Sequence, residues 1–348
     1  MTTLLSNTST TDRPVISVLL PFYNPGKSLR RALESIICQT FTKWELILID
    51  NGSTDETLAM AQEFAASDSR ITLCHEPRKG IVNALNHGLS MCRGIYIARM
   101  DADDVSHPDR LWLQMDFLRD NPGVSLVSGL VRYASESSAL EGYRRYVEWL
   151  NGIISENDIC RNMFIESPFA HPSVMFTRAA LEKYGTYAEG PFPEDYEMWL
   201  RWLCAGARCC KLPVTVLDWF DHPQRLSRTD PRYSPDAFNR VKIRYLDIWL
   251  RSHNPFHPCI AVWGAGKLGR KNAALLEELG HKVQFFIDVD TRKINAGKCI
   301  SYKDVPPAGT CFIIGFVGNR HVTPQIRAFL NERGYTETVD YMLAAGIS

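Results

Sequence analysis

The fold of this 348-residue chain is decided by residues 15–53, VISVLLPFYNPGKSLRRALESIICQTFTKWELILIDNGS. The apolar run at residues 15–20 is rich in β-branched side chains and stops at Pro21, as a buried strand does. Apolar residues then recur on one helical face, at Leu29, Ala32, Leu33, Ile36 and Ile37. A second apolar run, residues 44–49, ends at Asp50. The stretch therefore predicts a strand, a helix and another strand.

The same alternation continues downstream. Ser53 and Glu56 have the spacing of a capping box at the start of a helix. A strand, a helix and a strand are expected next, at residues 71–74, 81–89 and 95–100. This alternation predicts an α/β domain with a mainly parallel sheet, whose ligands bind at the carboxyl ends of the strands.

A second α/β pattern begins near residue 260, after a less regular middle. Helices are expected in that middle at residues 141–150, 156–164 and 196–204, followed by a surface loop at 221–236. We therefore expect a disordered tail at residues 1–12, a first domain at 13–235, a helix and linker at 236–256, and a small Rossmann-like α/β domain at 257–348.

Composition excludes several classes of protein. Lysine plus arginine and aspartate plus glutamate are 39 each, so the formal net charge is zero and gives no attraction for nucleic acid. The ten cysteines show no metal-binding spacing, and we interpret them as reduced thiols. The polar start lacks the pattern of a signal peptide, and no apolar stretch is long enough to span a bilayer. A cytoplasmic protein is expected, either free or peripheral on the inner face of the membrane.

Three carboxylates, Asp101, Asp103 and Asp104, follow the strand expected at residues 95–100. Crowding of like charges is costly, so a cation is expected beside them, and Mg²⁺ or Mn²⁺ prefers such oxygen ligands. The alternative is that Asp103 and Asp104 cap a helix that begins near Pro108 or lie in a solvated turn, and the Asp-x-Asp pattern alone favours that alternative.

The Asp-x-Asp pattern does not stand alone, because it is one of four sequence blocks that follow one another in order. They are VISVLLPFYN at 15–24, LIDNGSTD at 48–55, ARMDADD at 98–104 and PEDY at 193–196. With these blocks the chain resembles the inverting family 2 glycosyltransferases of the GT-A fold, over about Pro14 to Tyr233. The resemblance implies an α/β enzyme of two parts, with a GT-A domain followed by the small Rossmann-like domain.

The resemblance implies that Pro21, Tyr23, Asn24 and Asp50 hold the base and ribose of a nucleotide-sugar donor, with Asp50 accepting from a base N–H. From the residues alone, Pro21 ends a strand and residues 51–52 form a turn. Asn51 departs from the commoner second aspartate of the family.

Lys79 and Gly80, just before a helix, would lie near the nucleotide sugar, although an exposed lysine is the simpler interpretation of Lys79. The resemblance also implies that Asp103 binds the divalent cation, Mn²⁺ or Mg²⁺, directly. Asp101 then contacts the sugar, the ribose or the metal through water.

Asp195 matches the family's general base. Inversion requires the acceptor hydroxyl to lose its proton on the face opposite the leaving group, so a second carboxylate is needed. The alternative is that Asp195 caps the helix expected at 196–204.

His171 is either a residue on the acceptor side of the site or a core histidine. Arg225 or Arg228 would hold the phosphates if residues 222–228 form a loop that closes over the diphosphate. The alternative is an ordinary solvated loop. Trp199 and Trp202 are expected in the core.

The second domain carries the sequence Gly264-x-Gly266-x-x-Gly269 directly after a strand, with Asp288 at the end of the next strand. This is the context of a dinucleotide-binding fingerprint. Two interpretations stay open, a site for a nucleotide or nucleotide sugar and a purely structural glycine turn. Redox catalysis with NAD is disfavoured, because no Tyr-x-x-x-Lys pair is present in the domain.

Together these patterns predict a metal-dependent, inverting, non-processive glycosyltransferase. It would move a sugar from a nucleotide-diphosphate sugar, UDP-sugars being favoured, to a hydroxyl of a glycan or lipid-linked glycan in cell-surface polysaccharide synthesis. The Gln-x-x-Arg-Trp motif of processive synthases is absent from the sequence. The alternatives are a catalytically silent nucleotide-sugar-binding protein and an NAD-dependent sugar oxidoreductase.

Overall fold

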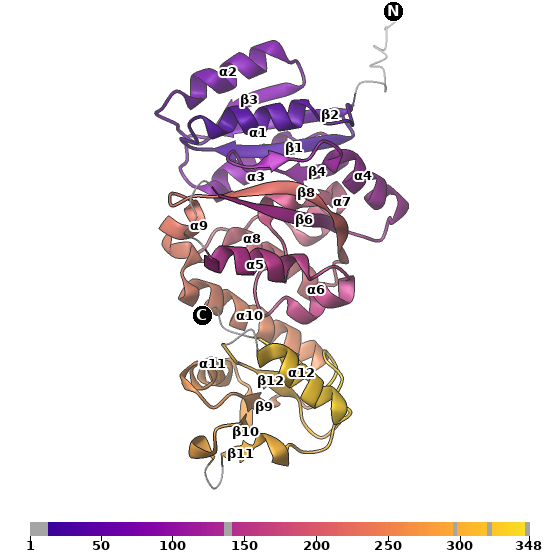
Figure 1. The fold of residues 1–348 in the computed structure, drawn as a ribbon, viewed down its shortest axis with the longest axis vertical. Helices are drawn as coiled ribbons and strands as arrows, with labels where there is room; N and C mark the ends of the chain where they lie inside the picture. Colours follow the sequence, from indigo (N-terminus) through magenta and orange to yellow (C-terminus); the bar gives the residue numbers. More distant parts are fainter. Residues whose placement is uncertain (1–12, 136–140, 295–297, 319–321, 345–348) are drawn as a thin grey trace, which may run out of the picture. The chain divides into compact units, whose positions relative to one another are not determined.

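The computed structural model describes residues 13–135, 141–294, 298–318 and 322–344, so the tail expected at 1–12 lies outside the described residues. The chain divides into two compact units. Unit 1 comprises residues 1–152, 169–187 and 208–222, and unit 2 comprises residues 153–168, 188–207 and 223–348. Each unit is thus built from separate segments of the chain, and each has its own sheet (Figure 1).

Unit 1 is organised around an eight-stranded sheet with the order β3-β2-β1-β4-β7-β6-β8-β5. Its strands are β1 (Ile16–Phe22), β2 (Trp44–Asp50), β3 (Ile71–His75), β4 (Tyr96–Arg99), β5 (Val105–Ser106), β6 (Leu126–Ser135), β7 (Met175–Thr177) and β8 (Cys209–Asp221). Strands β1 to β4 are mutually parallel, whereas β7 is antiparallel to β4 and to β6. The sheet is therefore mixed, with a parallel half formed by the first four strands.

The parallel register brings the strand ends of unit 1 to one edge. Phe22 of β1 pairs with Asp50 of β2, and Asp50 pairs with His75 of β3. Every residue of β1 and β2 is buried, which explains their nearly continuous apolar sequences. The loops that follow β1, β2, β3 and β4 consequently open on the same side.

Helices connect these strands. In unit 1 they are α1 (Ser28–Ile37), α2 (Thr57–Ser67), α3 (Ile81–Met91), α4 (Arg110–Asp120), α5 (Glu141–Asn151), η1 (His171–Ser173) and α7 (Arg178–Tyr184). The periodic residues Leu29, Ala32, Leu33 and Ile36 of α1 are fully buried in the core of this unit, as the helical periodicity predicts.

Unit 2 contains a five-stranded parallel sheet with the order β11-β10-β9-β12-β13. Its strands are β9 (Cys259–Trp263), β10 (Lys282–Asp288), β11 (Cys299–Ser301), β12 (Ile313–Gly315) and β13 (Tyr341–Leu343). Its helices are α6 (Glu156–Asn162), α8 (Glu194–Cys204), α9 (Leu226–Thr229), η2 (Pro231–Tyr233), α10 (Pro235–His253), α11 (Lys267–Glu278), η3 (Thr291–Lys293), η4 (Tyr302–Asp304) and α12 (Thr323–Glu332).

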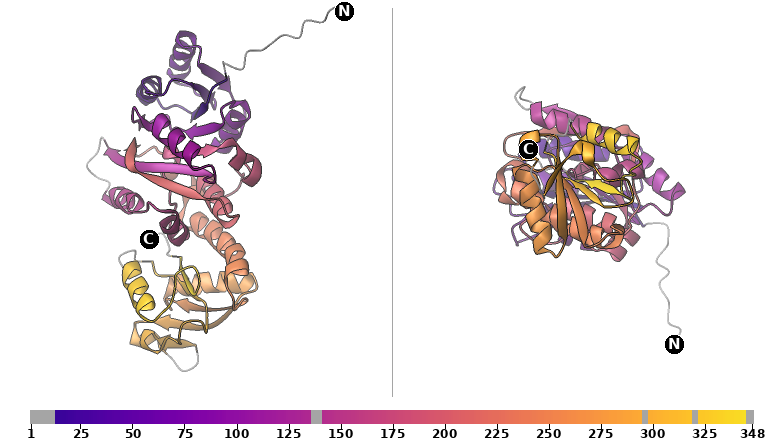
Figure 2. Two further views of the ribbon diagram at one scale, coloured as in Figure 1. Left: turned by 90° about the vertical axis from the view of Figure 1, so that its right-hand side faces the viewer. Right: turned by 90° about the horizontal axis from the view of Figure 1, so that it is seen from below.

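The strand order of unit 2 places α11 and α12 on opposite faces of its sheet. The connection through α11 leads from β9 to β10 on one side, and the connection through α12 leads from β12 to β13 on the other. Right-handed crossovers in opposite directions put their helices on opposite faces. Figure 2 shows the two helices flanking the strands in this way.

Helix α10 is part of the core of unit 2. Its residues Leu246 and Leu250 are fully buried, in one cluster with Tyr196 of α8 and Ile260 of β9. The helix that the sequence places between two domains therefore packs against elements that precede and follow it. The domain boundaries expected at 235 and 257 stay a prediction.

Among the described residues, no helix combines the length and the apolar character needed to cross a membrane.

Candidate functional site

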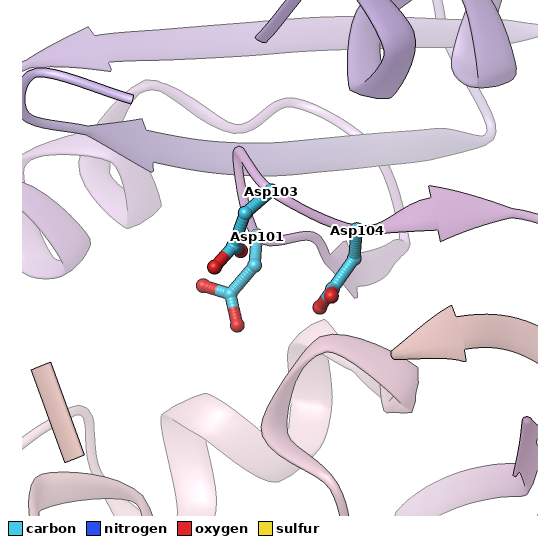
Figure 3. Close-up of side chains that lie close together, drawn as sticks. All are labelled: Asp101, Asp103 and Asp104. Atoms are coloured by element: carbon cyan, nitrogen blue, oxygen red, sulfur yellow. The ribbon is translucent and has the colours of Figure 1, made fainter. Parts of the chain in front are cut away.

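Three aspartates lie together where the chain leaves β4. One carboxylate oxygen of each of Asp101, Asp103 and Asp104 lies within 4.8 Å of the other two. Figure 3 shows the three side chains directed to the same side of their loop. A set of oxygen donors this close together matches what Mg²⁺ or Mn²⁺ requires.

Asp104 has a structural role in this cluster. It is fully buried, and its Oδ1 accepts a hydrogen bond from the backbone N–H of Phe220 at 2.8 Å. Asp109 is the N-cap residue of α4, so neither Asp103 nor Asp104 caps that helix. Asp101 and Asp103 are the two half-buried carboxylates of the cluster, and their contact with a ligand stays a prediction.

Asp103 has a partner that the sequence did not indicate. The ring Nε2 of His222 lies 2.8 Å from Asp103 Oδ2, although the two residues are 119 positions apart. His222 directly follows β8, which runs parallel to β6. The backbone at Asp103 is also held, because Arg31 donates to its carbonyl oxygen at 2.9 Å. Imidazole is a common ligand of divalent metals, so His222 is a further candidate ligand beside Asp103.

Asp101 is held by a buried arginine. Arg99, with 3% of its side chain exposed, forms an ion pair with Asp101. Arg110, also buried, donates to the carbonyl oxygen of Arg99 at 2.7 Å. Burial lowers the pKa of Arg110 to about 9, against an opposing effect of Asp104.

Asp50 is turned inward at the end of β2. It is 1% exposed, and its carboxylate accepts from Ser53 N at 2.9 Å and Gly52 N at 3.3 Å, with His75 Nδ1 at 2.9 Å. Burial raises the pKa of Asp50, but the hydrogen bonds from Ser53, His75 and Gly52 outweigh burial and leave the pKa below its ordinary value. Asp50 is therefore a charged acceptor that organises its own turn, and its contact with a base stays a prediction.

Asn24 joins the loops after β1 and β2. It adopts a positive φ of 48°, its N–H donates to Ser53 Oγ at 3.1 Å, and its Oδ1 accepts from Thr54 N at 2.7 Å. Its neighbour Tyr23 is 53% exposed, whereas Pro21 is buried within β1. Among these three predicted donor residues, Tyr23 offers the accessible ring.

Asn51 explains how Lys79 and Gly80 are placed. Its Nδ2 donates to the carbonyl oxygen of Arg78 at 2.9 Å, and its Oδ1 accepts from Gly80 N at 2.8 Å. Lys79 Nζ lies 5.4 Å from the centre of the Tyr23 ring. The amide that departs from the family pattern thus ties two loops together, since only an amide both donates and accepts in this way.

The predicted donor residues therefore gather at one edge of unit 1. Those residues are Pro21, Tyr23, Asn24, Asp50, Lys79, Gly80, Asp101 and Asp103, and all lie at or after the carboxyl ends of the parallel strands β1 to β4. Parallel sheets bind their ligands at that edge.

Asp195 lies in the first turn of α8, in unit 2. The N-cap residue of the helix is Pro193, so Asp195 is not its cap, and Asp195 Oδ1 accepts from Tyr196 N at 2.7 Å. The helix begins two residues before its expected start, at Glu194, whose buried carboxylate accepts from the Tyr233 hydroxyl. Asp195 itself is half-buried, and its role as general base stays a prediction.

Three other predicted side chains divide between core and surface. His171 is buried with its Nε2 2.7 Å from the hydroxyl of Tyr187, and burial, with a smaller effect of Arg99, holds its pKa well below the ordinary value. Arg225 is buried, whereas Arg228 is exposed.

Trp199 and Trp202 are buried, with ring centres 6.2 Å apart. Their prediction as core residues is confirmed.

Packing in unit 2 explains two glycines of the Gly264-x-Gly266-x-x-Gly269 motif. Gly264 has a positive φ of 110° and follows β9, and a Cβ at Gly269 would lie 1.8 Å from the carbonyl oxygen of Gly264. A Cβ at Gly266 would meet only Lys293 Nζ, at 3.8 Å. The close approach of α11 to the loop therefore requires glycine whether or not a ligand binds.

Asp288, the acidic residue of this motif, accepts from Ala265 N at 2.8 Å and Asp290 N at 2.9 Å, and Lys293 Nζ lies 3.1 Å away. Burial raises the pKa of Asp288, but these hydrogen bonds outweigh burial and lower it. The carboxylate is thus engaged within the loop, which supports the structural interpretation.

We expect Gly269→Ala to destabilise the protein by about 1–3 kcal/mol, because the new methyl group overlaps a backbone oxygen that cannot move aside. Gly318→Ala is the control, since its Cβ would meet only the flexible Leu268 side chain at 3.5 Å, and a change below about 0.5 kcal/mol is expected. Urea denaturation measures both. Equal stability of the two variants would contradict the packing account.

Comparison with known proteins relates the chain to one family. Residues 17–185 match the model "Glycosyl transferase family 2". The chain is 34% identical over 230 residues to the bifunctional glycosyltransferase pgtA of Dictyostelium discoideum, covering 55% of this chain but only 30% of that protein. It is 32% identical over 228 residues to the putative glycosyltransferase EpsE of Bacillus subtilis (strain 168), covering 64% of this chain and 79% of EpsE. It is also 32% identical over 206 residues to the amylovoran biosynthesis glycosyltransferase AmsE of Erwinia amylovora, covering 58% and 75%.

Solved structures share the fold at lower sequence identity. S. aureus TarS 1–349 in complex with UDP-GlcNAc superposes with a TM-score of 0.54 and 17% identity, covering 68% of this chain and 66% of that one. The mannosyltransferase PcManGT of Pyrobaculum calidifontis, in complex with GDP-Man and Mn²⁺, has a TM-score of 0.50 and 23% identity, covering 70% and 65%. These likenesses establish the same α/β fold.

Proposed function

Because the chain belongs to glycosyltransferase family 2, we propose that it transfers one sugar per encounter from a nucleotide-diphosphate sugar to a hydroxyl of a glycan or lipid-linked glycan, with inversion at the anomeric carbon. The observation that carries this proposal is the cluster of Asp101, Asp103 and Asp104 at the carboxyl edge of the parallel strands, with His222 Nε2 2.8 Å from Asp103 Oδ2. The similarity to an amylovoran biosynthesis enzyme supports a role in polysaccharide synthesis.

Asp103 and His222 would hold a divalent cation, and Asp101, which forms an ion pair with Arg99, would lie beside it. When bound, such an ion neutralises the negative charge that collects on a departing nucleoside diphosphate. Mn²⁺ is favoured, because imidazole and carboxylate together suit Mn²⁺ better than Mg²⁺ and a protein of the same fold is described with Mn²⁺.

The donor nucleotide is placed by the loops after β1, β2 and β3. Tyr23 offers a ring for the base, Asp50 an ionised acceptor, and Lys79 a cation next to that ring. We favour a UDP-sugar, which is the donor class described for TarS. GDP-sugars are the alternative, and the experiment below includes them.

Asp195 acts as the general base. Its carboxylate takes the proton of the acceptor hydroxyl while that oxygen bonds to the anomeric carbon and the bond from this carbon to the diphosphate breaks. The half-buried side chain accepts a hydrogen bond from Tyr196 N at 2.7 Å, which holds the carboxylate at the start of α8.

We test the proposal by the thermal stability of the full chain with UDP-, GDP-, dTDP- and CMP-sugars and with NAD, each with and without Mn²⁺, followed by product analysis with the stabilising donor. A ligand at a hundred times its Kd adds about 2.7 kcal/mol of stability. Stabilisation by one class of sugar nucleotide that depends on Mn²⁺ is expected. Stabilisation by NAD alone would overturn the proposal and point to the loop of Gly264, Gly266, Gly269 and Asp288.

A further inference from the structure

The acidic pair at the start of α8 lies beside a tyrosine hydroxyl that donates to Glu194. The carboxylate of Glu194 is 2% exposed, and the Tyr233 hydroxyl lies 2.9 Å from its Oε1 and 2.7 Å from its Oε2. Both residues belong to unit 2. Burial, followed by the negative charges of Glu194 and Asp195, holds the pKa of Tyr233 well above its ordinary value. The hydroxyl therefore stays protonated, and able to donate, at neutral pH.

Tyr233 is itself fixed on both sides. Before it, Asp230 caps the 3-10 turn η2 by accepting from Arg232 N at 2.9 Å and pairs with the Arg232 side chain at 2.8 Å. After it, Ser234 caps α10 by accepting from Ala237 N at 3.3 Å. Tyr233 thus ends a capped 3-10 turn that leads directly into a long helix with one buried face.

We propose that Tyr233 is a positioning residue for sugar transfer, which acts through Glu194 to fix the first turn of α8 and thereby aim the neighbouring Asp195 at the acceptor. The inference rests on the proposed function of Asp195. Removing a hydrogen bond from a buried carboxylate destabilises its ionised form. Glu194 should therefore shift when the Tyr233 hydroxyl is lost, and that shift displaces the residue next to it.

The same helix supplies a matched control. One turn further along α8, the buried Glu197 accepts a hydrogen bond from the hydroxyl of Tyr245. Tyr245→Phe removes the same chemical group from the same kind of pair, but the carboxylate that loses it, Glu197, does not adjoin Asp195. Both substitutions therefore test the loss of a buried tyrosine hydroxyl, and only Tyr233→Phe should affect catalysis.

The experiment measures kcat, the KM for each substrate and the melting temperature of the wild type, Tyr233→Phe, Tyr245→Phe and Glu194→Gln. We expect Tyr233→Phe to lower kcat about tenfold or more with the donor KM within about twofold, because donor residues lie in unit 1. Tyr245→Phe should keep kcat within about threefold of the wild type while losing comparable thermal stability.

A double-mutant cycle shows whether Tyr233 acts through Glu194. In the Glu194→Gln background, Tyr233→Phe should lower kcat less than it does in the wild type, because the two residues form one unit. Three outcomes would each overturn the inference: equal kcat in Tyr233→Phe and the wild type, equal losses of kcat in the two tyrosine variants, or additive effects in the cycle. The proposed function would still be supported in these cases by sugar transfer in the wild type and its loss in Asp195→Asn. A wild-type chain that transfers no sugar would overturn the proposed function and this inference with it.

Discussion

Asp195→Asn should lower the rate of sugar transfer by about 10²–10⁴-fold, the usual contribution of a general base, while donor binding stays within about twofold of the wild type. An amide has nearly the shape of a carboxylate but cannot take the proton of the acceptor hydroxyl. Its oxygen can still accept from Tyr196 N, so α8 should keep its start and the protein its stability. Single-turnover kinetics with saturating donor give the rate, and calorimetry gives donor affinity.

Asp236→Asn is the control for this substitution. Asp236 is likewise in the first turn of a helix of unit 2, but its side chain is 68% exposed and pairs with Lys271 on the surface. Such pairs contribute little, so activity and stability should both be unchanged. A rate for Asp195→Asn equal to that of this control would remove Asp195 from the mechanism.

Asp103→Asn should abolish the part of the stabilisation by donor that depends on Mn²⁺. In the wild type, donor at a hundred times its Kd adds about 2.7 kcal/mol to the free energy of unfolding. A neutral amide is a much poorer ligand for a divalent cation than a carboxylate. His222→Ala should weaken the dependence on Mn²⁺ by removing the ring that lies against Asp103. Thermal melting against Mn²⁺ concentration, at fixed donor, measures both variants.

The exposed Asp120 on α4 provides the control, since its side chain is 61% exposed and pairs with the neighbouring Arg119. Asp120→Asn should bind donor and Mn²⁺ as the wild type does. If Asp103→Asn retained the full Mn²⁺ response, the carboxylates after β4 would not be the metal site. A loss in Asp103→Asn alone, with His222→Ala unchanged, would restrict the site to the carboxylates.

The parallel half of the sheet in unit 1 was predictable because its signals are local. Strands β1 and β2 are buried along their whole length, so their sequences are continuous apolar runs. Strands β6 and β8 were not predicted, since β8 alternates between buried and exposed stretches and contains Pro213. Its place beside β6 is fixed by pairing across a long sequence separation.

The sequence by itself determined that the chain is an α/β protein, that Asp101 and Asp103 follow a buried strand, and that a helix lies next to Asp195, because each depends on residues close together in the chain. Only the tertiary structure decided that His222 meets Asp103, that Tyr233 holds Glu194, and that α10 lies in a core. Sequence periodicity specifies which face of an element is buried, whereas the partner of a polar side chain depends on where the fold brings distant strand and helix ends together.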